Sequence, residues 1–266
     1  MKLKLALGIV WLGLVANAEN VTVPETPQAL LQRAFDTRYE CTITGVIEIE
    51  TRKGEMAAMK RRMDVATKSI EDRLHTYAVF REPQYVRGVA FLGIEAAEAG
   101  KSEERFVYLP SLRKIRRVSG SQSEDAFLGT DLSYHDFERQ RGANYDVALE
   151  GQVTEAGENA WVISARPHRA TGYAAVEHVV AVSDFAILAT RYFKKDADAP
   201  YKELWMSRDR MIERGSCRVP TRIRVEDRQR GTSTVLDMKQ LRLDAELPDD
   251  LFSMVSLETK RKIPGI

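Results

Sequence analysis

The sequence predicts a mainly β protein built on a large antiparallel sheet, and two observations support this prediction. About ten or eleven segments alternate apolar and polar residues with a period of two, which is typical of strands with one buried and one solvated face. These segments show no strand–helix–strand rhythm, so we do not expect a parallel sheet. With 266 residues, 44% hydrophobic and 30% charged, the composition excludes a disordered chain and a polytopic membrane protein.

The N-terminus has the pattern of a bacterial secretory signal peptide. Lys2 and Lys4 precede an apolar run that ends in the small–x–small sequence Ala16-Asn17-Ala18. As a helix this run would span about 18 Å, too short to anchor in a bilayer core of about 30 Å. We expect cleavage after Ala18 and a periplasmic protein in which residues 19–266 form a single domain. This part has 38 basic and 39 acidic residues, a net charge of −1 that does not fit a nucleic-acid-binding protein.

A helix is expected over residues 26–38, before the sheet begins. Thr26 is a favourable N-cap, and Pro27 suits the first turn. The apolar residues that follow recur at helical spacing and form one stripe: Leu30, Leu31, Ala34 and Phe35. The helix therefore suits the covering of an apolar sheet face.

The strands are expected to follow in a meander. In the first, at residues 39–50, Cys41 and Ile43 alternate with Glu40 and Thr42. The other expected strands lie at residues 59–65, 74–80, 86–92, 106–118 (one strand that ends at Pro110 and resumes at Lys114), 160–165, 176–182, 185–193, 202–212, 219–225 and 233–243. Strands in such number must curl or close to bury their apolar faces.

Cys41 and Cys217 are the two cysteines, and an oxidising periplasm allows them to form a disulfide. The bridge would join positions 176 residues apart and add about 4 kcal/mol or more on the chain-entropy model. Two separate buried thiols are the alternative. Because the sequence does not fix the distance between them, both remain open.

The sequence contains no catalytic or metal-binding motif that we recognise. None of the four histidines pairs with another at i, i+4, and there is no Cys-x-x-Cys or Gly-x-Ser-x-Gly. His135-Asp136 lacks a third ligand. We therefore expect neither an enzyme nor a bound metal or cofactor.

One segment, at residues 106–137, combines features that loops rarely share. A hydrophobic strand ends at Pro110, and a basic cluster follows, which includes Arg113, Arg116 and Arg117. The loop beyond is unusually apolar. Candidate cavity or lid residues are Leu109, Phe127, Leu128, Leu132, Tyr134 and Phe137. Two interpretations are open. The loop covers an apolar cavity, or it packs into the core with Arg113 and Arg117 paired to Asp131 and Asp136.

The motifs in this segment resemble those of the outer membrane lipoprotein-sorting protein family, the LolA-like group. They are Tyr-Leu-Pro, Arg-x-x-Arg-Arg and Phe-Leu-Gly-Thr-Asp-Leu-Ser-Tyr-x-Asp-Phe, between Tyr108 and Phe137. Residues 83–92 and 247–252 resemble flanking parts of the family, so the resemblance extends over about residues 26–252. It implies a LolA/LolB-like fold, in which a strongly curved antiparallel half-barrel is covered on its concave side by helices and a loop lid.

The resemblance also implies a function. Such a protein is a periplasmic carrier that binds the acyl chains of a lipid or lipoprotein and moves this cargo towards the outer membrane, with peripheral membrane contact. An exporter of the resistance-nodulation-division type and an outer-membrane acceptor are candidate partners. Arg113, Arg116 and Arg117 are candidates for binding a headgroup or a partner. Because LolA-like folds also occur in regulators that bind an anti-sigma factor, an interaction module is the alternative function.

Overall fold

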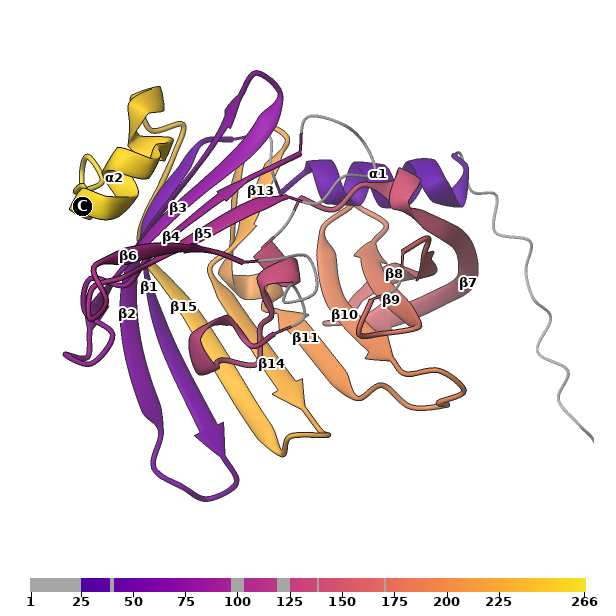
Figure 1. Ribbon diagram of the computed structural model, residues 1–266. Helices are drawn as coiled ribbons and strands as arrows, with labels where there is room; N and C mark the ends of the chain where they lie inside the picture. Colours follow the sequence, from indigo (N-terminus) through magenta and orange to yellow (C-terminus); the bar gives the residue numbers. More distant parts are fainter. Residues whose placement is uncertain (1–24, 39–40, 97–102, 119–124, 138, 170) are drawn as a thin grey trace, which may run out of the picture.

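A strongly curved antiparallel sheet of 13 strands forms most of the molecule, as the computed structural model shows (Figure 1). The structure describes residues 25–38, 41–96, 103–118, 125–137, 139–169 and 171–266, but not the side chains of Leu128 and Phe137. The signal-peptide prediction therefore lies outside the described residues. The curved antiparallel sheet is confirmed, with more strands than the ten or eleven expected.

The chain leaves the centre of the sheet towards one edge and returns from the other edge. The order is β6-β5-β4-β3-β2-β1-β15-β14-β11-β10-β9-β8-β7, so β1 and β15 meet in the middle. The first run comprises β1 (Ile43–Lys53), β2 (Met59–Ile70), β3 (Arg73–Glu82), β4 (Ala90–Ile94), β5 (Glu104–Leu109) and β6 (Lys114–Arg117). The second comprises β7 (Tyr145–Glu155), β8 (Glu158–Pro167), β9 (Ala175–Ala181), β10 (Ile187–Phe193), β11 (Lys202–Met206), β14 (Arg222–Asp227) and β15 (Thr232–Leu243).

This topology requires one connection between the two sheet edges, from β6 to β7. Its described part, residues 125–137 and 139–144, is called the crossing segment here. It contains three short 3-10 turns: η2 (Phe127–Gly129), η3 (Tyr134–Phe137) and η4 (Gly142–Asn144). Part of this segment lies inside the curve of the sheet (Figure 1). Phe127, Leu132 and Tyr134 are buried in one hydrophobic cluster with residues from both runs of strands. Its apolar composition therefore reflects a path across the concave face.

Helix α1 (Pro27–Asp36) confirms the predicted N-terminal helix, which ends two residues earlier than expected. The Thr26 hydroxyl accepts a hydrogen bond from the Ala29 amide at 3.2 Å, as an N-cap should. The predicted stripe is buried against strands of the second run. Burial of each large apolar side chain stabilises this arrangement by about 1.5–3 kcal/mol.

The C-terminal region covers the convex face of the first run of strands. It comprises η6 (Asp249–Phe252) and α2 (Met254–Thr259), on the outside of the curve in Figure 1. The Tyr77 hydroxyl donates to the carbonyl oxygens of Ser256 and Arg261, each at 3.0 Å. Leu251, Leu257 and their neighbours bury the outward face of β3 and β4. β3 is therefore covered on both faces.

The predicted strands are wrong in three places. Residues 202–212 form β11 and a separate strand β12 (Met211–Arg214), with a 3-10 turn between them. Residues 219–225 are divided in the same way between β13 (Cys217–Pro220) and β14, and β12 pairs with β13 in a small second sheet. We did not predict β7, because this edge strand is largely solvated and its register shifts beside Gly151.

Candidate binding site: a cavity on the concave face

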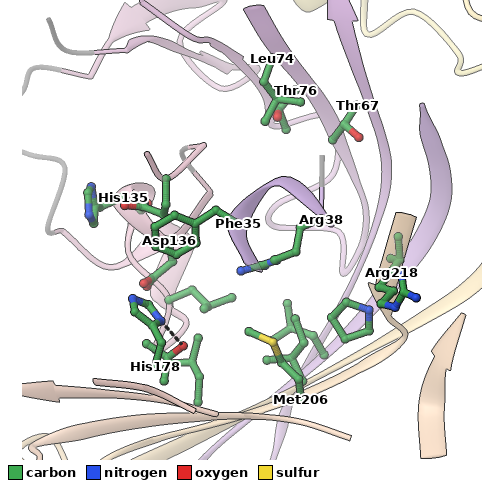
Figure 2. A pocket seen from close by; sticks show the side chains of 18 of the residues that line it. Phe35, Arg38, Thr67, Leu74, Thr76, His135, Asp136, His178, Met206 and Arg218 are labelled. Atoms are coloured by element: carbon green, nitrogen blue, oxygen red, sulfur yellow. Dashed lines mark hydrogen bonds between the residues drawn. The ribbon is translucent and has the colours of Figure 1, made fainter. Parts of the chain in front are cut away.

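A cavity of about 190 Å³ lies between the concave face of the sheet, α1 and the crossing segment (Figure 2). Its apolar walls come from α1, both runs of strands and the crossing segment: Phe35, Ile43, Ile47, Val65, Leu74, Leu132, Val176, Leu204, Met206, Val219, Ile223, Leu236 and Met238. A dry engineered cavity of about 150 Å³ binds benzene. The space therefore suits a small apolar group or a segment of an acyl chain.

Alternation along the central strands positions these walls. Ile43 and Ile47 share one face of β1, as the sequence predicts, and this is the concave face; Leu236 and Met238 share the same face on β15. Because β1 pairs with β15, these two apolar rows lie side by side at the centre of the sheet.

A buried ionic cluster holds the crossing segment at one side of the cavity. Asp136 and Lys202 have side chains that are 3% and 8% exposed, with Oδ2 and Nζ 2.7 Å apart. The Tyr192 hydroxyl donates to Asp136 Oδ1 at 2.7 Å, and the Ser133 amide donates to Oδ2 at 2.7 Å. Burial alone would raise the pKa of Asp136, but Lys202 and these hydrogen bonds together lower it. Asp136 thus stays ionised, and its carboxylate connects η3 to β10 and β11.

Two histidines line the same cavity. Burial lowers the pKa of His135 to about 4 and that of His178 to about 3, so both rings are neutral at pH 7. A hydrogen bond joins His135 Nε2 to the Tyr173 hydroxyl at 2.7 Å, and another joins His178 Nδ1 to the Thr190 hydroxyl at 3.2 Å. His178 also packs edge-on against Phe35 of α1, with ring centroids 5.2 Å apart. These rings therefore contribute to the cavity wall without adding charge.

Two arginines and the disulfide lie where α1 ends. Figure 2 shows Arg38 beside Phe35 at the cavity, with Arg218 further along the wall. Arg218 Nε is 2.9 Å from Asp184 Oδ2, and its backbone amide donates to the Thr37 carbonyl at 2.8 Å. In the structure a disulfide joins Cys41 to Cys217, with Cα atoms 5.9 Å apart. The end of α1 is thus held to the β12–β13 sheet.

The predicted lid residues occupy different places. Leu132 lines the cavity. Phe127 and Tyr134 lie beside it in an aromatic cluster, with centroids 5.3 Å apart, and Phe127 also meets Phe91 edge-on at 5.6 Å. Leu109 packs against the same hydrophobic cluster, whereas the side chains of Leu128 and Phe137 lie outside the described part. The crossing segment therefore both packs into the core and covers the cavity.

The predicted basic residues lie away from the cavity. Arg113, Arg116 and Arg117 are exposed at the β5–β6 turn and on edge strand β6. The pairing of Arg113 and Arg117 with Asp131 and Asp136, one part of the core-packing interpretation, is wrong. Asp131 Oδ2 accepts from the Thr234 hydroxyl at 2.7 Å, and Asp136 binds Lys202. Arg117 instead approaches Glu104 at 3.9 Å.

Sequence reasoning missed Tyr192 and His178, which line the cavity, and Lys202, which binds the cavity residue Asp136. Each lies on a strand that is far from η3 in the sequence but close to it in the fold, and local residue spacing does not indicate such contacts. The available signal for His178 was its place on the buried face of an alternating strand. Within the described ranges, no three His, Cys, Asp or Glu side chains gather closely enough to hold a metal. The same ranges contain no helix with the length and apolarity needed to cross a membrane.

Comparisons with known proteins agree with this architecture. The model of a protein family described only as “-like: Uncharacterized protein” matches residues 72–259. A DUF1329 family protein from Desulfovibrio piger is 24% identical, with a TM-score of 0.78 over 88% of this chain and 100% of its own. A domain assigned to the outer membrane lipoprotein-sorting proteins, from Vibrio parahaemolyticus, is 18% identical, with a TM-score of 0.80 over 87% and 98% of the two chains. A LolA superfamily protein from Nitrosomonas europaea is 23% identical, with a TM-score of 0.66 over 87% and 99%. No curated protein matches the chain by sequence.

Proposed function

Since the chain belongs to the family of uncharacterized proteins matched over residues 72–259 and has the fold of the LolA superfamily, we propose that it is a periplasmic carrier of a lipid or lipoprotein. The observation that carries this proposal is the apolar cavity between α1, the crossing segment and the centre of the sheet. In this role the cavity takes part of an acyl chain, and the protein moves its cargo towards the outer membrane.

The energetics favour binding without a reaction. Each buried methylene contributes about 0.8 kcal/mol, so a few methylenes in the cavity supply several kcal/mol. The polar groups around the cavity are engaged in holding the fold. Asp136 binds Lys202 and Tyr192, and His178 binds Thr190. These contacts favour binding over catalysis.

Loading and release require two states with different affinities for the cargo. In this proposal the crossing segment is the element that moves between the two states. Its Asp136 is joined to side chains on other strands by contacts that can break and form again. An open state would separate Asp136 from Lys202, and the closed state would restore the pair. A donor such as an exporter of the resistance-nodulation-division type and an acceptor at the outer membrane are the partners to test.

Mass spectrometry of organic extracts tests the proposal. The protein is purified from a periplasm without detergent, and a stoichiometric phospholipid or acylated peptide is the expected result. In the variant Leu204→Trp the cavity is filled, and the bound lipid should fall at least fivefold. Val255→Trp, at an exposed position on α2, is the matched control and should retain lipid.

Two outcomes would overturn the proposal: an empty wild-type protein, or lipid retained equally by Leu204→Trp. An empty protein that instead forms a tight complex with the ectodomain of a membrane protein would favour the interaction module.

A further inference from the structure

Two neighbouring hairpin turns and one edge strand form a continuous surface whose residues do not line the cavity. Residues 83–89 connect β3 to β4, and residues 110–113 connect β5 to β6. A Cβ atom on Gly88 would lie 3.8 Å from the Pro110 ring and 3.3 Å from the Lys260 side chain, so these parts are in contact. We call residues 83–89, 110–117 and Lys260 the edge surface.

Each turn presents a large apolar side chain to solvent. Tyr85 is 68% exposed in the first turn, and Leu112 is 48% exposed in the second. Exposure of these side chains to water is unfavourable, because burial of their apolar surface would lower the free energy. Each of two turns that are in contact therefore carries one large apolar side chain that the fold itself does not bury.

Basic residues outnumber acidic ones in and beside these turns. The whole chain has a net charge of only +1. Residues 83–89 and 110–117 contain no Asp or Glu and five basic residues: Arg87, Arg113, Lys114, Arg116 and Arg117. Two acidic residues lie beside them: Glu82, whose side chain is 61% exposed, directly precedes residue 83, and Glu104 lies 3.9 Å from Arg117. Lys260 adds a further positive charge over the Tyr108 ring at 5.1 Å. The edge surface is thus strongly positive on a near-neutral protein.

Protection of the sheet edge explains part of this pattern. β6 is an edge strand, and lysines and arginines on an edge discourage pairing with other chains. That explanation does not account for Tyr85 and Leu112, which lie in turns outside the strand. An aromatic and an aliphatic side chain within a basic rim match the chemistry of an anionic lipid surface, where apolar groups enter the interface and cations meet phosphates.

We propose that the edge surface docks the protein onto the anionic face of a phospholipid bilayer. Tyr85 and Leu112 enter the interfacial layer, while Arg87, Arg113 and Lys114 lie at the level of the lipid phosphates. None of these residues lines the cavity. The inference therefore goes beyond the carrier function and can stand or fail separately from it.

Co-sedimentation of the purified protein with vesicles tests the inference. One vesicle is phosphatidylcholine alone, and the other is phosphatidylcholine mixed with phosphatidylglycerol. The protein should partition only to the anionic vesicles, and added salt should weaken the partitioning because it screens surface charges.

Paired variants locate the contact. Arg113→Glu with Arg116→Glu should lower partitioning at least about tenfold, since each basic residue near an anionic surface contributes to attraction. Tyr85→Ser with Leu112→Ser should lower it at least about fivefold, since the apolar contact is lost. The controls are Arg210→Glu and Ile212→Ala, both exposed near the β12–β13 sheet, and they should bind as wild type does. Equal melting temperatures would show that all variants fold.

The outcomes separate this inference from the carrier function. Partitioning to neither vesicle, to both vesicles equally, or to anionic vesicles regardless of the edge variants would overturn the docking surface. Because Leu204→Trp fills the cavity, its vesicle binding should remain at the wild-type level. Loss of vesicle binding in that variant would show that cargo uptake, not docking, brings the protein to lipid, and would also refute the inference.

Discussion

The ionic cluster at Asp136 makes a specific prediction about what holds the crossing segment. Asp136→Asn keeps the shape of the side chain but removes its charge. Oδ2 accepts from Lys202 at 2.7 Å and from the Ser133 amide and hydroxyl at 2.7 and 3.0 Å, while Oδ1 accepts from Tyr192 at 2.7 Å. The substitution leaves the Lys202 ammonium buried without its carboxylate. We expect the crossing segment to lose its polar attachment to β10 and β11.

The size of the effect follows from burial. Removing one partner of a buried pair costs about 3–5 kcal/mol, because the other charge remains desolvated. A domain of this size loses about 2–4 °C of melting temperature per kcal/mol, so the Tm should fall by roughly 6–20 °C. The double variant Asp136→Asn with Lys202→Met removes both charges and should recover most of the loss.

Chemical denaturation with circular dichroism measures these changes as a double-mutant cycle, and lipid retention is measured on the same samples. Arg224→Met, an exposed basic position on β14, is the control and should change stability by less than about 0.5 kcal/mol. A loss below 1 kcal/mol in Asp136→Asn, or a double variant no more stable than the single one, would refute the reasoning.

Three further predictions concern other parts of the core. The pKa of His178 is about 3 in the folded protein and ordinarily 6.5. Its contribution to the free energy of unfolding is therefore complete above pH 6.5 and is lost as the pH falls, because the unfolded chain takes up the proton first. The stability advantage of wild type over His178→Gln should therefore shrink by about 1.4 kcal/mol per pH unit between pH 6.5 and 5, and a pH-independent difference in denaturation midpoints would contradict this. Cys41→Ser with Cys217→Ser should lower the free energy of unfolding by about 5 kcal/mol, given the 176-residue separation, and wild type in reductant should match the variant. Phe127→Ala should cost about 3–5 kcal/mol, because this buried ring contacts three others, whereas a loss under 1 kcal/mol would mean that it is not a core residue.

Local patterns were sufficient where a structural element depends on its own residues. Thr26 and Pro27 begin α1 as predicted, and the apolar stripe that ends at Phe35 faces the sheet. Ile43 and Ile47 share one face of β1, because alternation alone determines this, but the pattern did not show that this face lines the cavity. The excess of apolar residues in the loop predicted burial of Phe127, although not the path that causes it.

Pairing across long sequence separations could not be predicted from these patterns. Nothing near Ile43 indicates that its partner is Leu243. Nothing near Asp136 indicates Lys202, since an ion pair inside a core depends on where two strands end in the sheet. The split of residues 202–212 was missed for a related reason, because β11 and β12 belong to different sheets although both are extended.

The central seam between β1 and β15 bears on the order in which the chain folds. Each run of strands is a meander of near neighbours and has the local contacts that form early. The seam, by contrast, joins Ile43 to Leu243 and needs nearly the whole chain. When the N-terminal part of the chain appears first, β1 therefore remains an unpaired edge beside an apolar face until residues 232–243 are available to pair with it. This interval is when the protein is most prone to aggregation and most dependent on a chaperone.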